Sequence, residues 1–230
     1  MIFRAMNLII DTMGLGFWCY HWFAPIFYIY EGVSLGKDTW FELMQKREWD
    51  YKNTLFMANI RAISLNCGSF ADFVSGLPGN IVNNTYHFNV THYSVYKGNS
   101  FGDRTIIRTF KNAVAPVGPY AAYRGSLAVA LNFAYAMGYK TIILYGVDLQ
   151  NSGYFWKDYK WVNPHTQTCH NQEENALHST IASGQYRPID EYIYFLRNAI
   201  FKKEDIEVYV GNKKSLLYPQ LSYWGGNKND

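Results

Sequence analysis

The sequence predicts an α/β fold, Rossmann-like, with a mostly parallel sheet, helices on both faces and a small lid. The main observation is the stretch 125–153, in which an apolar helix, a glycine turn and a short β-branched strand follow one another. Residues 127–137 are apolar almost all round, as in a helix buried on most sides, and Gly138 stands where a C′ glycine ends such a helix. The continuous apolar run 141–145 is typical of a central strand in a parallel sheet.

Length and composition narrow the classes of function. At 230 residues the chain is long enough for one domain with a sizeable core, and its net charge of +3 leaves no basic footprint for nucleic acid. Aromatic residues make up 18% of the chain, which suits a packed aromatic core but also contacts with sugars, bases or a membrane interface. The cysteines are three in number and lack metal-ligand spacing, so we expect a reducing, cytoplasmic location.

Residues 12–30 lack charged side chains and are the one candidate for a membrane span. Two glycines, a histidine and Pro25 interrupt this segment, and it is rich in aromatic residues rather than in leucine. We therefore expect a loop followed by a strand at 26–30, and no membrane-spanning helix.

The remaining elements follow from periodicity and from turn residues. After the strand at 26–30 we expect a helix at 38–47 capped by Asp38, a strand at 55–58, loops with short strands in 66–99 (81–82 and 86–90), a strand at 106–110, a rigid turn at 116–119, a long polar loop at 150–184, an amphipathic helix at 189–201 after Pro188, and a closing strand at 206–210. In domain terms, 1–149 would form a nucleotide-sugar-binding core, 150–188 a lid over the acceptor, and 189–230 the helix and strand that complete the core.

Two places in the central stretch are suited to hold a ligand. Gly125 and Ser126 open the apolar helix, where free backbone N–H groups and the positive end of the helix dipole attract anions. Asp148 follows the strand at its carboxyl end, where open α/β sheets place their ligands. The alternative is a buried helix–strand pair of an α/β core that binds nothing.

A family resemblance bears on this choice. The run Ser126–Asp148, with its alanine-rich helix, Gly-Tyr-Lys and strand-Gly-Val-Asp, resembles the bacterial sialyltransferases that act on lipooligosaccharide, and the related motility-accessory and pterin-pyrophosphokinase-like proteins. Residues 2–7 resemble that family's second strand, and 206–217 resemble its last strand and closing turn. In that family a first strand and a loop that binds the nucleotide precede the strand matched by residues 2–7. Either this strand and loop lie upstream of Met1, or this protein forms its nucleotide site from other residues.

The resemblance implies a metal-independent glycosyltransferase that transfers sialic acid or a related acidic sugar from a CMP-activated donor to a glycan or lipid-linked acceptor. The general base would be His178, with Asp190 as its partner, and the alternatives in the same loop are His165 and His170. At the positions where the family has two phosphate-binding tyrosines, this chain has Gln150 and Trp156. Residues expected to contact the donor are Asn7, Gly125, Ser126, Asp148, Gly153 and Tyr154, and those expected in the acceptor lid are Trp156, Tyr159 and His165.

We expect no metal and no cofactor beyond the donor itself, because the chain contains no Asp-x-Asp pair. The resemblance allows peripheral contact with the inner membrane, and the composition is compatible with a homo-oligomer. Two other functions stay open: a noncatalytic nucleotide- or carbohydrate-binding module, and an ATP-dependent pyrophosphokinase-like enzyme.

Overall fold

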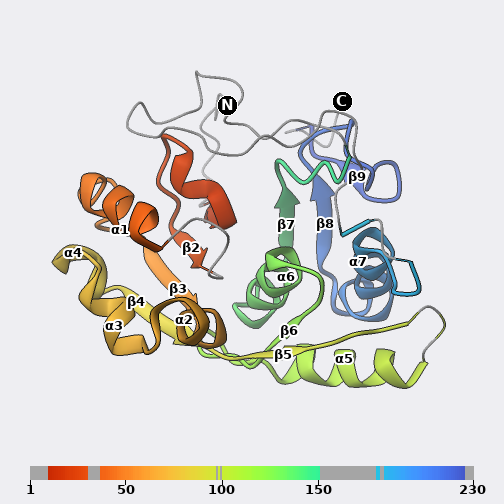
Figure 1. Ribbon diagram of the computed structural model, residues 1–230. Coiled ribbons are helices and arrows are strands. Elements are labelled where there is room, and N and C mark those ends of the chain that lie inside the picture. Colours follow the sequence, from red (N-terminus) through yellow and green to blue (C-terminus); the bar gives the residue numbers. More distant parts are fainter. Residues whose placement is uncertain are drawn as a thin grey trace. The chain divides into compact units, whose positions relative to one another are not determined.

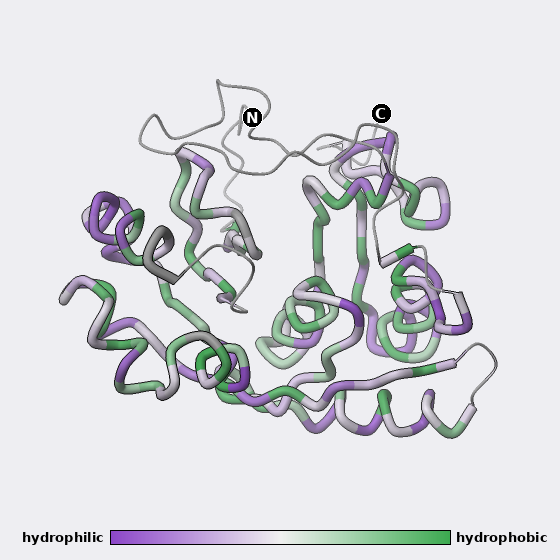
Figure 2. Tube along the Cα trace, viewed as in Figure 1, coloured by the Kyte–Doolittle hydropathy of each residue, from purple (hydrophilic) through white to green (hydrophobic). Residues whose placement is uncertain are grey.

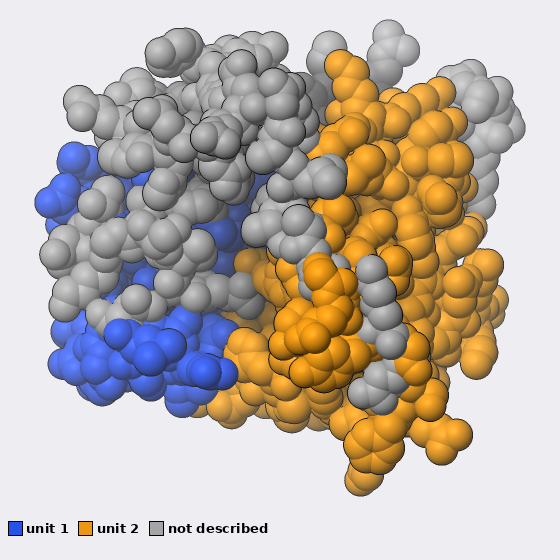
Figure 3. Space-filling view, turned by 45° about the vertical axis from the view of Figure 1, so that its right-hand side comes forward, with its two compact units in different colours: residues 1–86 blue, residues 87–230 orange. Residues whose placement is uncertain are grey.

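The computed structural model describes residues 10–30, 37–96, 98, 100–150, 180–181 and 184–225. The fold is α/β, with helices that flank mostly parallel sheets, as Figure 1 shows. The strand pairs β1–β2, β2–β3, β5–β6, β7–β8 and β8–β9 are all parallel. The predicted Rossmann-like α/β class is therefore confirmed. The chain divides into two compact units, 1–86 and 87–230, which Figure 3 colours separately.

The first unit is built on a sheet with the strand order β1-β2-β3-β4, whose last strand reaches the boundary with the second unit. Its elements in chain order are β1 (Met13–Leu15), the 3₁₀ helix η1 (Gly16–Tyr20), β2 (Phe27–Tyr30), α1 (Lys37–Lys46), β3 (Leu55–Asn59), α2 (Ile60–Cys67), α3 (Phe70–Ser75), α4 (Gly79–Val82) and β4 (Thr85–Phe88).

Aromatic side chains and one buried arginine hold the first unit together. The rings of Tyr30, Trp40 and Phe73 pack on one another, with centroids 4.6–5.7 Å apart. Arg47 is only 2% exposed, and its guanidinium donates to the carbonyls of Cys19, His21 and Trp22. Because those hydrogen bonds satisfy a charge that would be costly to bury alone, Arg47 fixes the loop between η1 and β2 onto α1.

The second unit contains a two-stranded and a three-stranded parallel sheet, with orders β5-β6 and β7-β8-β9. Its elements in chain order are β5 (Val90–His92), α5 (Ser100–Asn112), β6 (Tyr120–Ala122), α6 (Ser126–Ala136), β7 (Thr141–Leu144), α7 (Ile189–Ala199), the 3₁₀ helix η4 (Phe201–Glu204), β8 (Glu207–Val210) and β9 (Ser222–Tyr223).

The core of the second unit lies between its strands and three helices. In Figure 2 the trace of α6 is mostly green, which marks apolar residues, and residues 128–133 of this helix are all buried. Side chains from α5, α7 and β8 complete the same cluster. Asn132, which is fully buried, accepts a hydrogen bond from the N–H of Ala121 at 2.8 Å and donates one to the carbonyl of Phe110 at 2.8 Å. One amide side chain thus joins α6 to both β6 and α5.

Several expected elements are confirmed. The strands predicted at 26–30, 55–58, 141–145 and 206–210 correspond to β2, β3, β7 and β8, and the helices predicted at 38–47, 127–137 and 189–201 correspond to α1, α6 and α7. Gly138 follows α6 with φ = +82°, as a C′ glycine should. Residues 13–30 form short strands and a 3₁₀ helix, and among the described residues no helix is both long and apolar enough to cross a membrane.

Other expectations were wrong. Residues 106–110 belong to the helix α5, because Ile106 and Phe110 are spaced by one helical turn and are both buried. Residues 81–82 lie in the helix α4, and helices also replace most of the loop expected at 66–75. We expected the rigid turn at 116–119 to lead into the apolar helix of the central stretch, but it leads into the strand β6. Asp38 is the second residue of α1, which begins at Lys37, and so does not stand at the position before the helix.

The strand β7 is also less central than expected. Among the described strands it pairs only with β8, and Thr141 at its start is exposed. Within this three-stranded sheet β8 has a neighbour on both sides, and its Val208 and Val210 belong to the core.

Candidate functional site

The helix α6 begins shortly after the parallel strand β6 ends. Arg124 and Gly125 have φ values of +54° and +138°, so the chain turns sharply before the helix begins. In this described stretch no side chain caps the helix, and a Cβ atom at Gly125 would meet no atom within 4 Å. The first backbone N–H groups of α6 are therefore not occupied by a capping side chain, and the positive end of the helix dipole adds to their attraction for an anion.

A second feature joins the carboxyl ends of β7 and β8. The amide of Asn212 donates to the carboxylate of Asp148 at 3.4 Å, and the N–H of Leu216 donates to the Asp148 carbonyl at 3.0 Å. The Ser215 hydroxyl donates to the Val147 carbonyl at 2.6 Å. The loops that follow β7 and β8, around 148 and 212–217, are therefore hydrogen bonded to each other.

Gly211 has a steric reason to lack a side chain. A Cβ atom there would lie 2.2 Å from the ring of Tyr145, so the ring packs directly over the glycine backbone. Burial raises the pKa of Tyr145, and the neighbouring Tyr223 raises it further. The ring covers the point where β8 ends.

A third feature lies where β5 and β6 end. The N–H of Tyr93 donates to the carbonyl of Ala122, which extends the pairing of the two strands by one step. The Tyr123 hydroxyl donates to the carbonyl of Arg187 and lies 3.3 Å from that of Val95. Burial raises the pKa of Tyr123, although the charges of Arg124 and Arg187 act in the opposite direction.

Arg187 completes this corner of the second unit. It is 8% exposed, and its guanidinium forms an ion pair with Asp103 at 2.8 Å and lies 4.9 Å above the ring centre of Phe195. Its N–H donates to the Val95 carbonyl at 3.1 Å. The segment just before α7 is thus fixed to the ends of β5 and β6 and to the first turn of α5.

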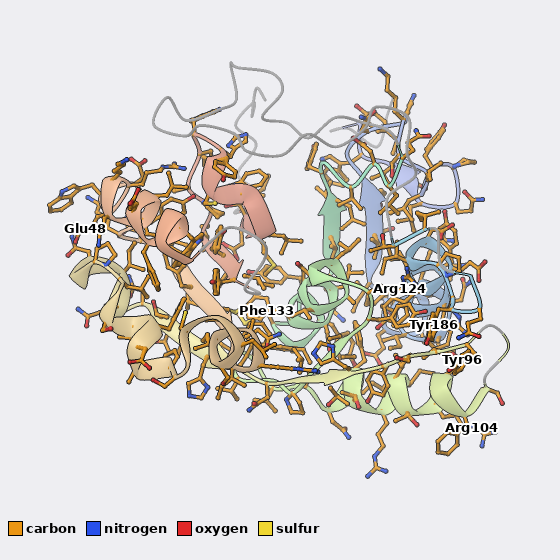
Figure 4. All side chains as sticks on the ribbon, viewed as in Figure 1. Glu48, Tyr96, Arg104, Arg124, Phe133 and Tyr186 are labelled. Atoms are coloured by element: carbon orange, nitrogen blue, oxygen red, sulfur yellow. The ribbon has the colours of Figure 1, made fainter. Side chains whose placement is uncertain are left out.

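Beside this buried arrangement the rings of Tyr96 and Tyr186 stack at the surface. Their centroids are 5.1 Å apart with an angle of 27° between the planes, and an antiparallel bridge joins their backbones. A side-chain hydrogen bond with Tyr186 raises the pKa of Tyr96. Figure 4 labels both tyrosines, which belong to the second unit.

The structure describes only part of the site that the sequence predicts. Gly125, Ser126 and Asp148 lie at the loop ends just described, and Asp190 lies in the first turn of α7. Among the described residues no hydrogen bond or ion pair joins Asp148 to Gly125 or Ser126. The other predicted residues lie outside the described ranges: Asn7, Gly153, Tyr154, Trp156, Tyr159, His165, His170 and His178.

Gln150 and Asp190 can be placed individually. Gln150, which stands where the family has a tyrosine, donates from its side-chain amide to the carbonyl of Lys214. This hydrogen bond ties the end of the β7 loop to the β8 loop. One carboxylate oxygen of Asp190 is buried and has no hydrogen-bond partner among the described residues. A group with a proton to donate would satisfy this oxygen, as the expected pairing with a histidine requires.

The sequence alone did not single out Arg124, Tyr96 or Tyr186. Tyr96 lies in the range 66–99, where the sequence predicted loops and short strands. The signal that could have found Arg124 is its position between a strand and a glycine-opened helix, where a cation adds to the helix dipole.

The described ranges contain no candidate metal site. No group of three or more His, Cys, Asp or Glu side chains within them could hold an ion. Comparison with known proteins adds nothing to the site, because no family model, no curated protein and no solved structure matches the chain.

Proposed function

We propose that this chain is a metal-independent glycosyltransferase that moves sialic acid or a related acidic sugar from a CMP-activated donor to a glycan hydroxyl. The observation that carries the proposal is the segment Ser126–Asp148. It bears the family resemblance, begins with a helix N-terminus free of a capping side chain, and ends at the carboxyl end of a parallel strand.

Each part of this segment has a role in the proposed reaction. The N–H groups at the start of α6 would bind the phosphate of the donor and stabilise the charge that develops on it as the sugar departs. The loop of Asp148, held by Asn212, would border the nucleotide. The acceptor hydroxyl needs a base, and a histidine that is neutral near pH 7 can take its proton. His178 is proposed for this role on the sequence alone.

CMP binding provides a direct test. We expect CMP to raise the melting temperature of the full chain equally with Mg²⁺ and with EDTA, because a ligand that binds only the folded state stabilises it by mass action. A shift with ATP and Mg²⁺ alone would favour the pyrophosphokinase-like function, and CMP binding without transfer would favour a noncatalytic module.

Two glycines at opposite ends of α6 form a matched pair of variants. Gly125 and Gly138 both have positive φ, and a Cβ atom at either would meet nothing within 4 Å, so alanine introduces backbone strain but no clash. We expect Gly125→Ala to weaken CMP binding at least about tenfold, because it moves the N–H groups that bind the phosphate. Gly138→Ala should leave CMP affinity unchanged. Equal CMP affinity in both variants would place the phosphate elsewhere.

A further inference from the structure

A cavity of about 370 Å³ lies in the second unit, where the C-terminal end of α7, the 3₁₀ helix η4 and the strands β8 and β9 meet. Its volume is within the range of pockets that bind small molecules. Glu207, the first residue of β8, lines it, whereas Asp148 and Asn212 follow the carboxyl ends of β7 and β8. The cavity is therefore separate from the candidate site described above.

Charges of opposite sign line this cavity and come from different elements. Arg197 of α7 and Lys202 of η4 supply two cations. Asp205, in the turn after η4, and Glu207 supply two carboxylates. Within the described part of the chain none of these four side chains forms an ion pair. The cavity thus offers a ligand charges of both signs that the protein does not neutralise itself.

The walls of the cavity are held in place by contacts that do not involve a ligand. The Tyr209 hydroxyl donates to the carboxylate of Glu207 at 2.7 Å, and the ring of Tyr209 packs 5.1 Å from that of Trp224. In η4, the carboxylate of Glu204 accepts a hydrogen bond from the Tyr135 hydroxyl at 2.7 Å, which fixes η4 to α6. Because these walls are already ordered, a ligand loses little free energy in ordering them.

The lining is suited to a ligand that carries both charges. An anion would pair with Arg197 and Lys202 but would meet two carboxylates, and a cation would face the reverse problem. A molecule with one carboxylate and one ammonium group satisfies both sets of charges, because a guanidinium binds a carboxylate through two parallel hydrogen bonds and a carboxylate accepts hydrogen bonds from an ammonium group. Ser222 adds a hydroxyl that can donate or accept.

We infer that this cavity binds a free amino acid. The carboxylate of the amino acid pairs with Arg197 and Lys202, and its ammonium group pairs with Glu207 and Asp205. The inference does not rest on the proposed glycosyltransferase function, because it uses none of the residues assigned to the donor or to the acceptor.

The test is ligand-observed NMR on the full chain with the standard amino acids as probes, in low-salt buffer because salt screens exposed charges. The amino acid that binds best is then compared with its N-acetyl form, which lacks the ammonium group, and with its methyl ester, which lacks the carboxylate. We expect each blocked form to bind at least about tenfold more weakly, since each has lost one charged contact. Equal binding of either blocked form, or no binding of any amino acid, would overturn the inference.

Variants place the amino acid in the cavity. Arg197→Gln and Glu207→Gln should each weaken its binding at least about tenfold, because each removes one charge and keeps the size of the side chain. Arg108→Gln on α5 and Glu191→Gln on α7 are the matched controls, because both residues are exposed, belong to the same unit and lie outside the cavity. We expect both controls to bind as the wild type does. Unchanged binding in either cavity variant would overturn the inference.

Discussion

Two stacked tyrosines in the second unit form a matched pair for testing the packing and hydrogen bonding behind the site. The rings of Tyr123 and Tyr192 lie 4.6 Å apart, and the two residues are 1% and 0% exposed. The Tyr123 hydroxyl donates to the carbonyl of Arg187, whereas the buried Tyr192 hydroxyl has no hydrogen-bond partner in the described part of the chain. Replacement by phenylalanine removes a hydroxyl from either ring of the stack. The Tyr123 hydroxyl is hydrogen bonded, whereas the Tyr192 hydroxyl is not bonded to any described residue.

The two replacements should differ in sign. Tyr123→Phe removes a hydrogen bond and leaves the buried Arg187 carbonyl without this donor, at a cost of about 1–2 kcal/mol of unfolding free energy. Tyr192→Phe removes a buried polar group whose lack of a partner costs about 1–3 kcal/mol, so this variant should be neutral or more stable than the wild type. For a chain of this length about 1 kcal/mol corresponds to roughly 2–4 °C in melting temperature.

Thermal unfolding followed by circular dichroism measures this difference. We expect Tyr192→Phe to melt about 5 °C or more above Tyr123→Phe, by the same conversion. If Tyr192→Phe is destabilised as much as Tyr123→Phe, the Tyr192 hydroxyl has a partner in solution and the reasoning fails.

Three further predictions concern single side chains. Asn132→Leu should cost about 2–5 kcal/mol, because it leaves a buried N–H of β6 and a buried carbonyl of α5 unpaired, and a urea midpoint close to that of the wild type would contradict this. Gly211→Ala should lower the melting temperature, because its Cβ atom would meet the Tyr145 ring at 2.2 Å; an unchanged value would mean that the ring moves freely. Burial, and next the charge of Arg47, lower the pKa of His21 from 6.5 to about 4, so the unfolded chain takes up a proton that the folded chain does not. Stability should therefore fall as the pH drops from about 6.5 to about 4, and His21→Asn should reduce that loss; an identical pH profile would contradict it.

The parts of the fold that were predictable from the sequence are those with a strong local pattern. The segment 126–148 combines an all-round apolar helix, a C′ glycine and an apolar strand, and each of these signals depends only on neighbouring residues. The same holds for α7, with Pro188 before it and acidic residues in its first turn.

The errors come from patterns that were short or ambiguous. Ile106, Ile107 and Phe110 fit a brief apolar strand, yet their spacing also fits one face of a helix, and packing against the core selects the helix α5. The strand β6 has only three residues between a proline turn and a glycine turn, so its pattern is too short to stand out. It exists because it pairs with β5, a contact that local sequence does not encode.

The same distinction between local patterns and long-range pairing applies to the residues of the candidate site. Gly125 and Asp148 were found because each stands at the end of a predictable element. Tyr96 and Tyr186 come from loops far apart in the chain, and a backbone bridge and the hydrogen bonds of Arg187 with Val95 and Tyr123 bring them together. Sequence periodicity carries no information on such a pairing.

The most direct test of the proposed function is release of CMP from a CMP-activated sialic acid in the presence of a glycan acceptor and EDTA. We predict transfer to the acceptor at the same rate with EDTA and with Mg²⁺, and loss of transfer in His178→Ala with CMP binding retained, while His170→Ala, at another histidine of the same loop, keeps activity. A wild-type chain that binds CMP but transfers no sugar under either condition would contradict the proposal.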